Sequence, residues 1–456
     1  MEARLGTSLE SPGLRDLGHL KGMSMDPWLQ ELDHPTQDFF PALAARLREP
    51  DGLRQALCEA VEHLTPRVDW EGHLPQMPHG LLGLRAVLRL EDHLSKASFH
   101  RLLATQLHAF AHEGRAPAGQ GLLHLSLGSG NRQNLDMALQ NRHPAIAWGE
   151  AATLAEPSVI DFAGLPNRFA RDMANVGHKA VVAHHLADLF ELLERPLATG
   201  RCLLGLAAWL GVSEPSDHFW HARARKRLEG AEISLEPAPP KLAPELHSQA
   251  ARELCESGLV AMLDSFTNLM KAGATEDDLL AILVLAASEK QLDARRDLEG
   301  KTAWNFVYLA LLPAQEASET WLQAAALVNF FPTDDEETRV KGEQPLEEPT
   351  DPFRAVLDAI LDAEPARAMG LMSLLWRKEG DAGALRALAE AASRNDPATN
   401  HSHQALAVAA AVDLLPFLTE PAKACLFEAL AKFLANSQGS DDLGRAADRA
   451  LENPVR

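Results

Sequence analysis

The sequence is poor in the residues that favour β-sheet and in those that build disulfide frameworks. Its 456 residues include four cysteines, one tyrosine and five isoleucines, and aromatic residues make up only 5% of the chain. Alanine and leucine dominate the periodic segments instead. Because such a composition favours helix over sheet, we predict an all-α protein with more than half of its residues helical and essentially no sheet.

The scarcity of cysteine and of long apolar runs narrows the class of protein further. Cys58, Cys202, Cys255 and Cys425 lie far apart, which excludes a zinc ribbon or a thioredoxin-like pair and indicates reduced core cysteines. No apolar run approaches the roughly 18 residues that a membrane helix needs. The first 25 residues carry charges and a proline rather than the apolar segment of a signal peptide. We therefore expect a cytoplasmic protein with no membrane partner.

The chain also has few basic residues for its number of acidic ones. Its 43 Lys and Arg residues stand against 64 Asp and Glu residues, which gives a formal net charge of −21. An acidic surface repels a nucleic-acid backbone. We expect no nucleic-acid partner, and a small-molecule substrate or another protein instead.

Proline, glycine and charge patterns divide the chain into six regions. These are a disordered or extended tail (1–35), a His-rich helical region (36–228), a Pro-rich linker (229–245), a middle helical region (246–332), an acidic loop (333–352) and a C-terminal helical region (353–456). Apolar helices recur in pairs at spacings of roughly 35 to 45 residues. This predicts a multi-helical bundle of packed helical hairpins, with a solenoid-like stack as the alternative.

Two helix starts can be predicted from capping residues. Thr275 is followed three residues later by Asp278, just before a Leu-rich run, which is close to a capping box with Asp in place of Glu. Ser98 is the candidate N-cap of a helix over 99–112.

Histidines are concentrated in the first half, since sixteen of the nineteen precede residue 222. On a helix that begins near His178, His185 shares its face and His184 lies about a third of a turn away. His401 and His403 are two apart, which suits a loop or a helix start. Histidine is the commonest metal ligand, although any one of these residues taken singly is more often a core, capping or surface residue. His218 and His221, three apart, would share one helix face.

Several well-known catalytic motifs are absent. The chain has no His-Glu-x-x-His motif and no Gly-x-Ser-x-Gly elbow. Gly128 to Gly130 is not followed by Gly-Lys-Ser, so a plain loop is the better interpretation than a phosphate loop. The segment from Lys301 to Tyr308 groups Trp304, Phe306 and Tyr308 beside polar residues. It predicts either a buried helix with a polar start or one wall of a pocket for a planar ligand.

Three strings give the chain a resemblance to a known family. Pro-His-Gly-Leu-Leu-Gly-Leu at 78–84, Gly-His-Lys-Ala-Val at 177–181 and the Leu/Ala-rich run at 279–287 stand in the same order as similar strings in the questin oxidase-like family. The resemblance spans residues 70 to about 435 in short islands. It implies an all-helical protein in which scattered histidines converge on a non-haem iron, and members of the family include oxygenases that open or cleave polycyclic aromatic compounds.

Carried over to this chain, the resemblance supports His79 and His178 as metal ligands. To these we add His184 or His185, and His401 or His403, from geometry and neighbourhood. The expected metal is non-haem iron, and no single catalytic residue is assigned.

One departure from the family pattern is the pair Trp304-Asn305, where a histidine would be expected ahead of an aromatic-rich helix. Trp304, Phe306 and Tyr308 are predicted to line the substrate side. The expected function is a non-haem-metal oxygenase acting on an aromatic or polyketide-like small molecule. The alternative is a non-catalytic helical scaffold or protein-interaction module.

Overall fold

The fold is built from α-helices joined by turns and longer loops. The computed structural model describes residues 26–452 apart from 71–77, 118–119, 171–173, 214–225, 227–234, 236–237, 295–296, 298–299, 315–317, 331–341 and 344–347. Helix accounts for 74% of the structure, and the described residues contain no strand, only an isolated bridge between Val68 and Arg115. The prediction of an all-α protein is confirmed.

The helices follow one another in four groups. The first holds α1 (Pro27–Asp33), α2 (Phe39–Arg46), α3 (Gly52–Leu64), α4 (His79–Arg89) and α5 (Lys96–Ala111). The second holds α6 (Arg132–Gln140), α7 (Pro144–Ala152), α8 (Val159–Ala163), α9 (Leu165–Phe169), α10 (His178–Leu192) and α11 (Leu197–Val212). The third holds α13 (Pro244–Glu256), α14 (Leu259–Lys271), α15 (Glu276–Asp293), α16 (Trp304–Leu309) and α17 (Ser318–Phe330). The last holds α18 (Pro352–Leu361), α19 (Pro365–Ala392), α20 (His403–Leu414), α21 (Glu420–Asn436) and α22 (Asp442–Glu452).

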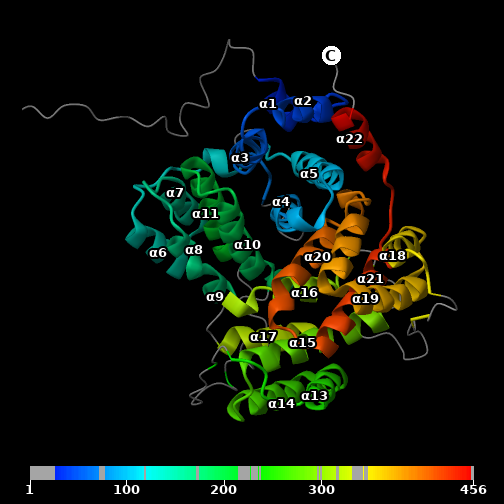
Figure 1. Cartoon of the computed structure of the whole chain (residues 1–456). Helices are drawn as coiled ribbons and strands as arrows, with labels where there is room; N and C mark the ends of the chain where they lie inside the picture. The colour runs from blue at the N-terminus through cyan, green and yellow to red at the C-terminus, as the bar shows by residue number, and fades with distance from the viewer. Residues whose placement is uncertain are drawn as a thin grey trace, which may run out of the picture.

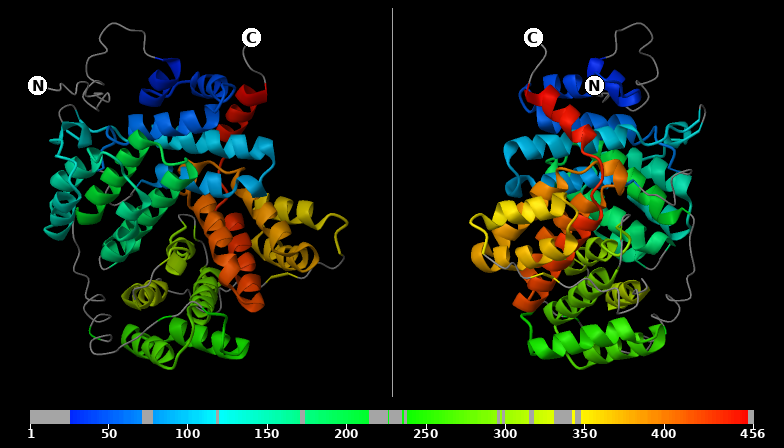
Figure 2. Two further views of the ribbon diagram at one scale, coloured as in Figure 1. Left: turned by 60° about the vertical axis from the view of Figure 1, so that its left-hand side comes forward. Right: turned by 90° about the vertical axis from the view of Figure 1, so that its right-hand side faces the viewer.

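Consecutive helices pack as hairpins, and the chain then closes on itself. The pairs α4–α5, α6–α7, α10–α11 and α18–α19 are in contact, which confirms the prediction of packed hairpins. Helix α22 returns to pack on α2 and α5 (Figure 1). In Figure 2 the first helices and α22 stay at one end of the molecule and α13 and α14 at the other. In an open solenoid each repeat contacts only the repeats next to it. The contacts of α22 with α2 and α5 therefore show a closed helical bundle rather than a solenoid-like stack.

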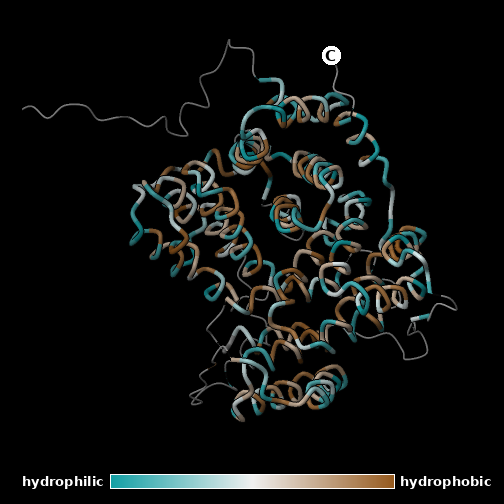
Figure 3. Tube along the Cα trace, in the orientation of Figure 1, coloured by the Kyte–Doolittle hydropathy of each residue, from teal (hydrophilic) through white to brown (hydrophobic). Residues whose placement is uncertain are grey.

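One hydrophobic core extends through the bundle. Its buried apolar side chains form a continuous cluster from Trp28 in α1 to Ala447 in α22. Most helices alternate hydrophobic and hydrophilic residues, as the tube in Figure 3 shows for α13 and α14. Helices α11, α15 and α20 are different, because nearly all their residues are buried among other helices. Helix α4 packs against α5, α10 and α20, a position that matters for the site described below.

The capping predictions have mixed outcomes. The capping box of α15 is present: Thr275 accepts from the backbone N–H of Asp278, and Asp278 accepts from the N–H of Thr275. The prediction of Ser98 as an N-cap is wrong by one turn. Helix α5 begins at Lys96 and its cap is Ser95, whose hydroxyl accepts from the N–H of Ser98.

Two predicted boundaries also differ from the structure. Helix α1 lies inside the predicted tail, because Trp28 and Leu32 are apolar enough to join the core. Pro244 opens α13 rather than ending the linker, as proline fits the first turn of a helix. About half of the linker and most of the acidic loop lie outside the described residues, as do His218 and His221. Among the described helices, none is long and apolar enough to cross a membrane.

Candidate metal centre

Three histidines that are far apart in the sequence meet at one point. His79, His178 and His403 are each the first residue of their helix, α4, α10 and α20. One ring nitrogen from each lies within 4.8 Å of the others, and Nε2 of His79 is 3.2 Å from Nε2 of His178. We refer to these three residues as the histidine triad. The expected approach of His79 and His178 is thereby observed, and the third member comes from the C-terminal region.

The spacing of His79 and His178 fits two ligands of one transition metal. Two nitrogens that each lie about 2.1 Å from one ion are separated by roughly 3 to 3.5 Å, which matches the 3.2 Å separation of His79 and His178. The side chains are 7 to 8% exposed, so little water competes for the ring nitrogens. The cluster within the described residues holds only histidines, and it therefore offers three neutral ligands. Three neutral ligands leave the full charge of the ion available to polarise whatever completes its coordination.

The backbone ahead of two of these helices is unusual. Val176 and Gly177 precede α10 with φ of 49° and 80°, and His401 and Ser402 precede α20 with φ of 51° and 64°. Left-handed φ is strained for a β-branched residue such as valine. At Gly177 a Cβ atom would also lie 2.4 Å from Cε2 of Tyr308, so only glycine fits. These turns aim the first side chain of each helix at the shared point.

Trp304, the first residue of α16, forms one wall of the cluster. Its ring stacks on His178 with centroids 3.8 Å apart and planes 10° apart. Its indole N–H donates to the carbonyl of Val176 at 3.0 Å. The centroid of His403 is 5.5 Å away. At the position where sequence analysis expected a histidine, this chain therefore has a flat aromatic ring that fixes the plane of His178.

The three helix starts also bring their positive ends together. The first N–H groups of a helix lack partners within it, and they carry a partial positive charge. Helices α4, α10 and α20 all turn this end toward the triad. The field favours an anionic group beside the triad.

The remaining predicted ligands lie outside the triad. His401 is exposed at its rim, with its ring centroid 5.6 Å from that of His79. His185 is buried seven residues along α10, about 10 Å from His178 along the axis. Neither ring nitrogen of His185 has a hydrogen-bond partner among the described residues, and burial, then the charge of Arg85, holds its pKa well below the usual value.

His184 faces a different part of the molecule. It lines a pocket of about 250 Å³ with Phe162 of α8 and Asp188 of α10. Burial lowers its pKa to about 4, so its ring is neutral near neutral pH. The prediction allowed either His184 or His185 beside His79 and His178, and the structure groups neither with them.

The three aromatic residues of α16 are all fully buried. Trp304 and Tyr308 are one turn apart and share a face, whereas Phe306 projects about 200° away from Trp304. The ring of Tyr308 packs on Gly177, next to His178. Its hydroxyl has no partner among the described residues, and burial raises its pKa. Trp304 and Tyr308 therefore border the histidine triad, and Phe306 belongs to the core behind them.

Sequence analysis did not single out Glu113, which lies beside the start of α4. Its Oε1 accepts from the N–H of Gly80 at 2.9 Å, and its Oε2 has no partner among the described residues. Burial raises its pKa to about 8, against the opposing effects of the Gly80 hydrogen bond and of Arg115. A single acid in a Gly-rich loop gives no sequence signal for this position.

Comparisons with known proteins do not identify this chain: no family, curated protein or solved structure matches it. The resemblance to the questin oxidase-like family stays a prediction. The chemistry of the site is therefore argued from its geometry.

Proposed function

We propose that the protein is a metal-dependent oxygenase that holds a non-haem iron with His79, His178 and His403. The observation that carries the proposal is the convergence of three imidazole nitrogens from three separate helices within 4.8 Å. Three histidines occupy about half of an octahedral shell and leave open positions for dioxygen and substrate. A bound iron would supply activation of dioxygen at those positions.

The surroundings of the triad support a planar, electron-rich substrate. Trp304 places an aromatic ring next to the metal ligands, and planar substrates gain most from flat apolar walls. The converging helix starts stabilise a deprotonated oxygen such as a phenolate or enolate. We therefore propose an aromatic or polyketide-like small molecule as the substrate.

Backbone strain at the same place is a second support. Val176, His401 and Ser402 are non-glycine residues with left-handed φ, and all three flank the triad. Such strain persists where the surrounding structure enforces it, and it clusters at functional sites.

The test is the metal content of protein purified without an affinity tag from cells supplied with iron, manganese and zinc. We expect about one iron per chain in the wild type and in His401→Ala, the exposed neighbour of the triad. His178→Ala should contain almost none, because removing one of three ligands leaves too few to retain the ion.

Oxygen consumption with a hydroxylated polycyclic aromatic compound should follow the iron content of these proteins. Equal, near-zero metal in wild type and His178→Ala would contradict the proposal and favour the non-catalytic scaffold. Stoichiometric zinc with no oxygen consumption would point to a structural metal site instead.

A further inference from the structure

A second polar cluster joins the same three helices beyond the triad. Arg85 of α4 is 1% exposed, and it donates from Nε to Asp188 of α10 and from Nη2 to Asp413 of α20, each at 2.6 Å. Arg89, one turn further along α4, donates from both Nε and Nη2 to Asp188 at 3.0 Å. Its Nε is also 3.5 Å from an oxygen of Asp413. We call these four residues the distal clamp.

On each of the three helices, one member of the distal clamp lies the same number of residues beyond the histidine of the triad. Asp188 is the tenth residue after His178, Asp413 the tenth after His403, and Arg89 the tenth after His79. Ten residues of α-helix span about 15 Å. The three helices therefore start together at the triad and are tied together again about 15 Å further on.

The charged groups of the distal clamp neutralise one another. Two guanidinium groups face two carboxylates, so the cluster is neutral as a whole. Burial acts to raise the pKa of Asp188, but the charges of Arg85 and then Arg89 outweigh it and hold that pKa below its usual value. Arg85 is too buried to find water if one carboxylate moves away. Sliding one helix past another would therefore separate buried charges, which is strongly unfavourable.

We propose that Arg85, Asp188 and Asp413 are positioning residues for the metal, because they lock the axial register of α4, α10 and α20. The inference rests on the proposed metal binding by the triad. A slide of one helix by a single residue moves its histidine by about 1.5 Å. Metal–nitrogen bonds near 2.1 Å tolerate only a few tenths of an ångström, so such a slide removes one ligand.

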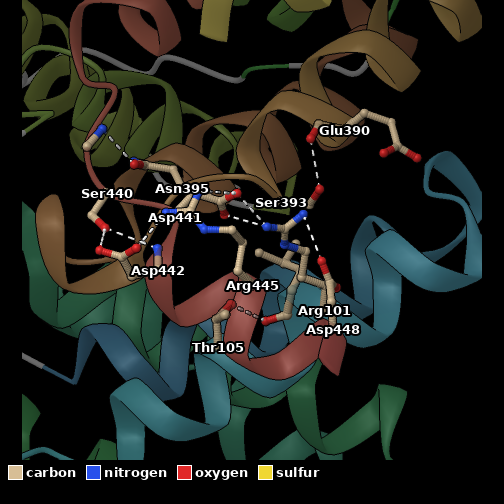
Figure 4. A network of polar contacts seen from close by, with 12 residues as sticks. Arg101, Thr105, Glu390, Ser393, Asn395, Ser440, Asp441, Asp442, Arg445 and Asp448 are labelled. Carbon is tan, nitrogen blue, oxygen red and sulfur yellow. Dashed lines mark hydrogen bonds and ion pairs between the residues drawn. The ribbon is translucent and has the colours of Figure 1, made fainter. Parts of the chain in front are cut away.

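The chain offers a matched control in a second buried ion cluster. Arg101 of α5, 6% exposed, contacts Asp441 at 2.5 Å, just before α22, and Asp448 within α22 at 3.3 Å. Figure 4 shows this cluster and its neighbours. Neither α5 nor α22 carries a member of the triad. Arg101→Met and Asp441→Asn therefore remove similar buried interactions, but none between the three helices that carry the histidines.

The experiment measures Co²⁺ binding to the full chain by its visible absorption, with stability followed by urea unfolding. We expect Arg85→Met and Asp413→Asn to weaken Co²⁺ binding at least tenfold and to alter the spectrum. Arg85→Lys, which keeps the charge, should recover part of the affinity. Arg101→Met and Asp441→Asn should lose comparable stability yet keep the wild-type affinity and spectrum.

A measurement without metal separates this inference from the proposed function. The ring of Trp304 lies against His178 and near His403. In protein labelled with 5-fluorotryptophan, the ¹⁹F resonance of Trp304 therefore reports the arrangement of these histidines. The resonance is assigned by its disappearance in Trp304→Phe. The resonance should shift in the Arg85 and Asp413 variants and stay fixed in the two controls. If the wild type binds no Co²⁺, the proposed metal binding is contradicted. The ¹⁹F shift still tests whether the distal clamp positions the three histidines. An unchanged resonance, or equal changes in clamp and control variants, would overturn the positioning role.

Discussion

At the scale of single residues, the acid beside α4 controls how stability responds to pH. The carboxyl of Glu113 has an ordinary pKa of 4.5 and a folded pKa of about 8 because it is buried. Between these values the folded state holds a proton that the unfolded state has released. The contribution of Glu113 to stability should therefore fall as pH rises from about 4.5 to about 8 and then level off.

Glu113→Gln removes this pH dependence. The amide oxygen can still accept from the N–H of Gly80, and the side chain cannot ionise. Relative to wild type, the variant should therefore gain stability steadily as pH rises. Urea unfolding at pH 5, 7 and 8.5 measures the difference, with the exposed Glu420→Gln as control. Parallel pH profiles for wild type and Glu113→Gln would show that the burial of Glu113 has no energetic consequence.

The sequence identified His79 and His178 as a pair and named His403 only as an alternative to His401, and physical reasons explain why it could not go further. His79 and His178 sit in distinctive strings, and both open helices. His401 and His403 could not be separated, because the choice depends on a left-handed Ser402 that makes His403 the first helical residue. The partners of Arg85 lie 103 and 328 residues away, so no local pattern reveals the clamp.

At the scale of helices, α15 is held at both ends by buried charges. Asp278 accepts backbone N–H bonds from Lys241, Leu242 and Thr275, and it pairs with His247. Burial acts to raise the pKa of Asp278, but these hydrogen bonds lower it to about 2. At the other end, Nζ of Lys432 donates to the carbonyls of three residues in the last turn and just beyond it: Gln291, Leu292 and Ala294. The first cap was predictable from a local motif; the second joins residues some 140 positions apart.

Lys432→Met should destabilise the protein by about 3 kcal/mol, since it removes several charge-assisted hydrogen bonds and leaves buried carbonyls unpaired. The apolar volume is nearly conserved, so lost packing contributes little. Lys378→Met, whose lysine is 46% exposed in a surface ion pair, should change stability by less than about 0.5 kcal/mol. Urea unfolding of both variants makes the comparison. A similar small loss for both would mean that the carbonyls of α15 find other partners.

At the scale of the whole molecule, the regions that composition separates are joined by packing. The N-terminal region supplies α4, α5 and α10, and the middle region supplies α15 and α16. The C-terminal region packs onto them through α4–α20, α5–α22, α15–α21 and α16–α20. The triad itself draws His79 and His178 from the first region and His403 from the last. Sequence composition marks where charge and proline gather, but it carries no information on which helices share a core.

This packing predicts the behaviour of a split chain. A fragment of residues 1–340 lacks α20, so it exposes the apolar face of α4 and leaves Arg85 without Asp413. Because a buried charge without its partner is strongly destabilising, we expect this fragment alone to lack a cooperative unfolding transition. Co-expressed with residues 341–456, it should form a one-to-one complex that survives size-exclusion chromatography and unfolds in one step, since the shared core drives association. Asp413→Asn in the second fragment should weaken the complex more than Lys378→Met does. Cooperative unfolding of the first fragment by itself would show that it forms an independent domain, and the triad would then lie across a domain boundary.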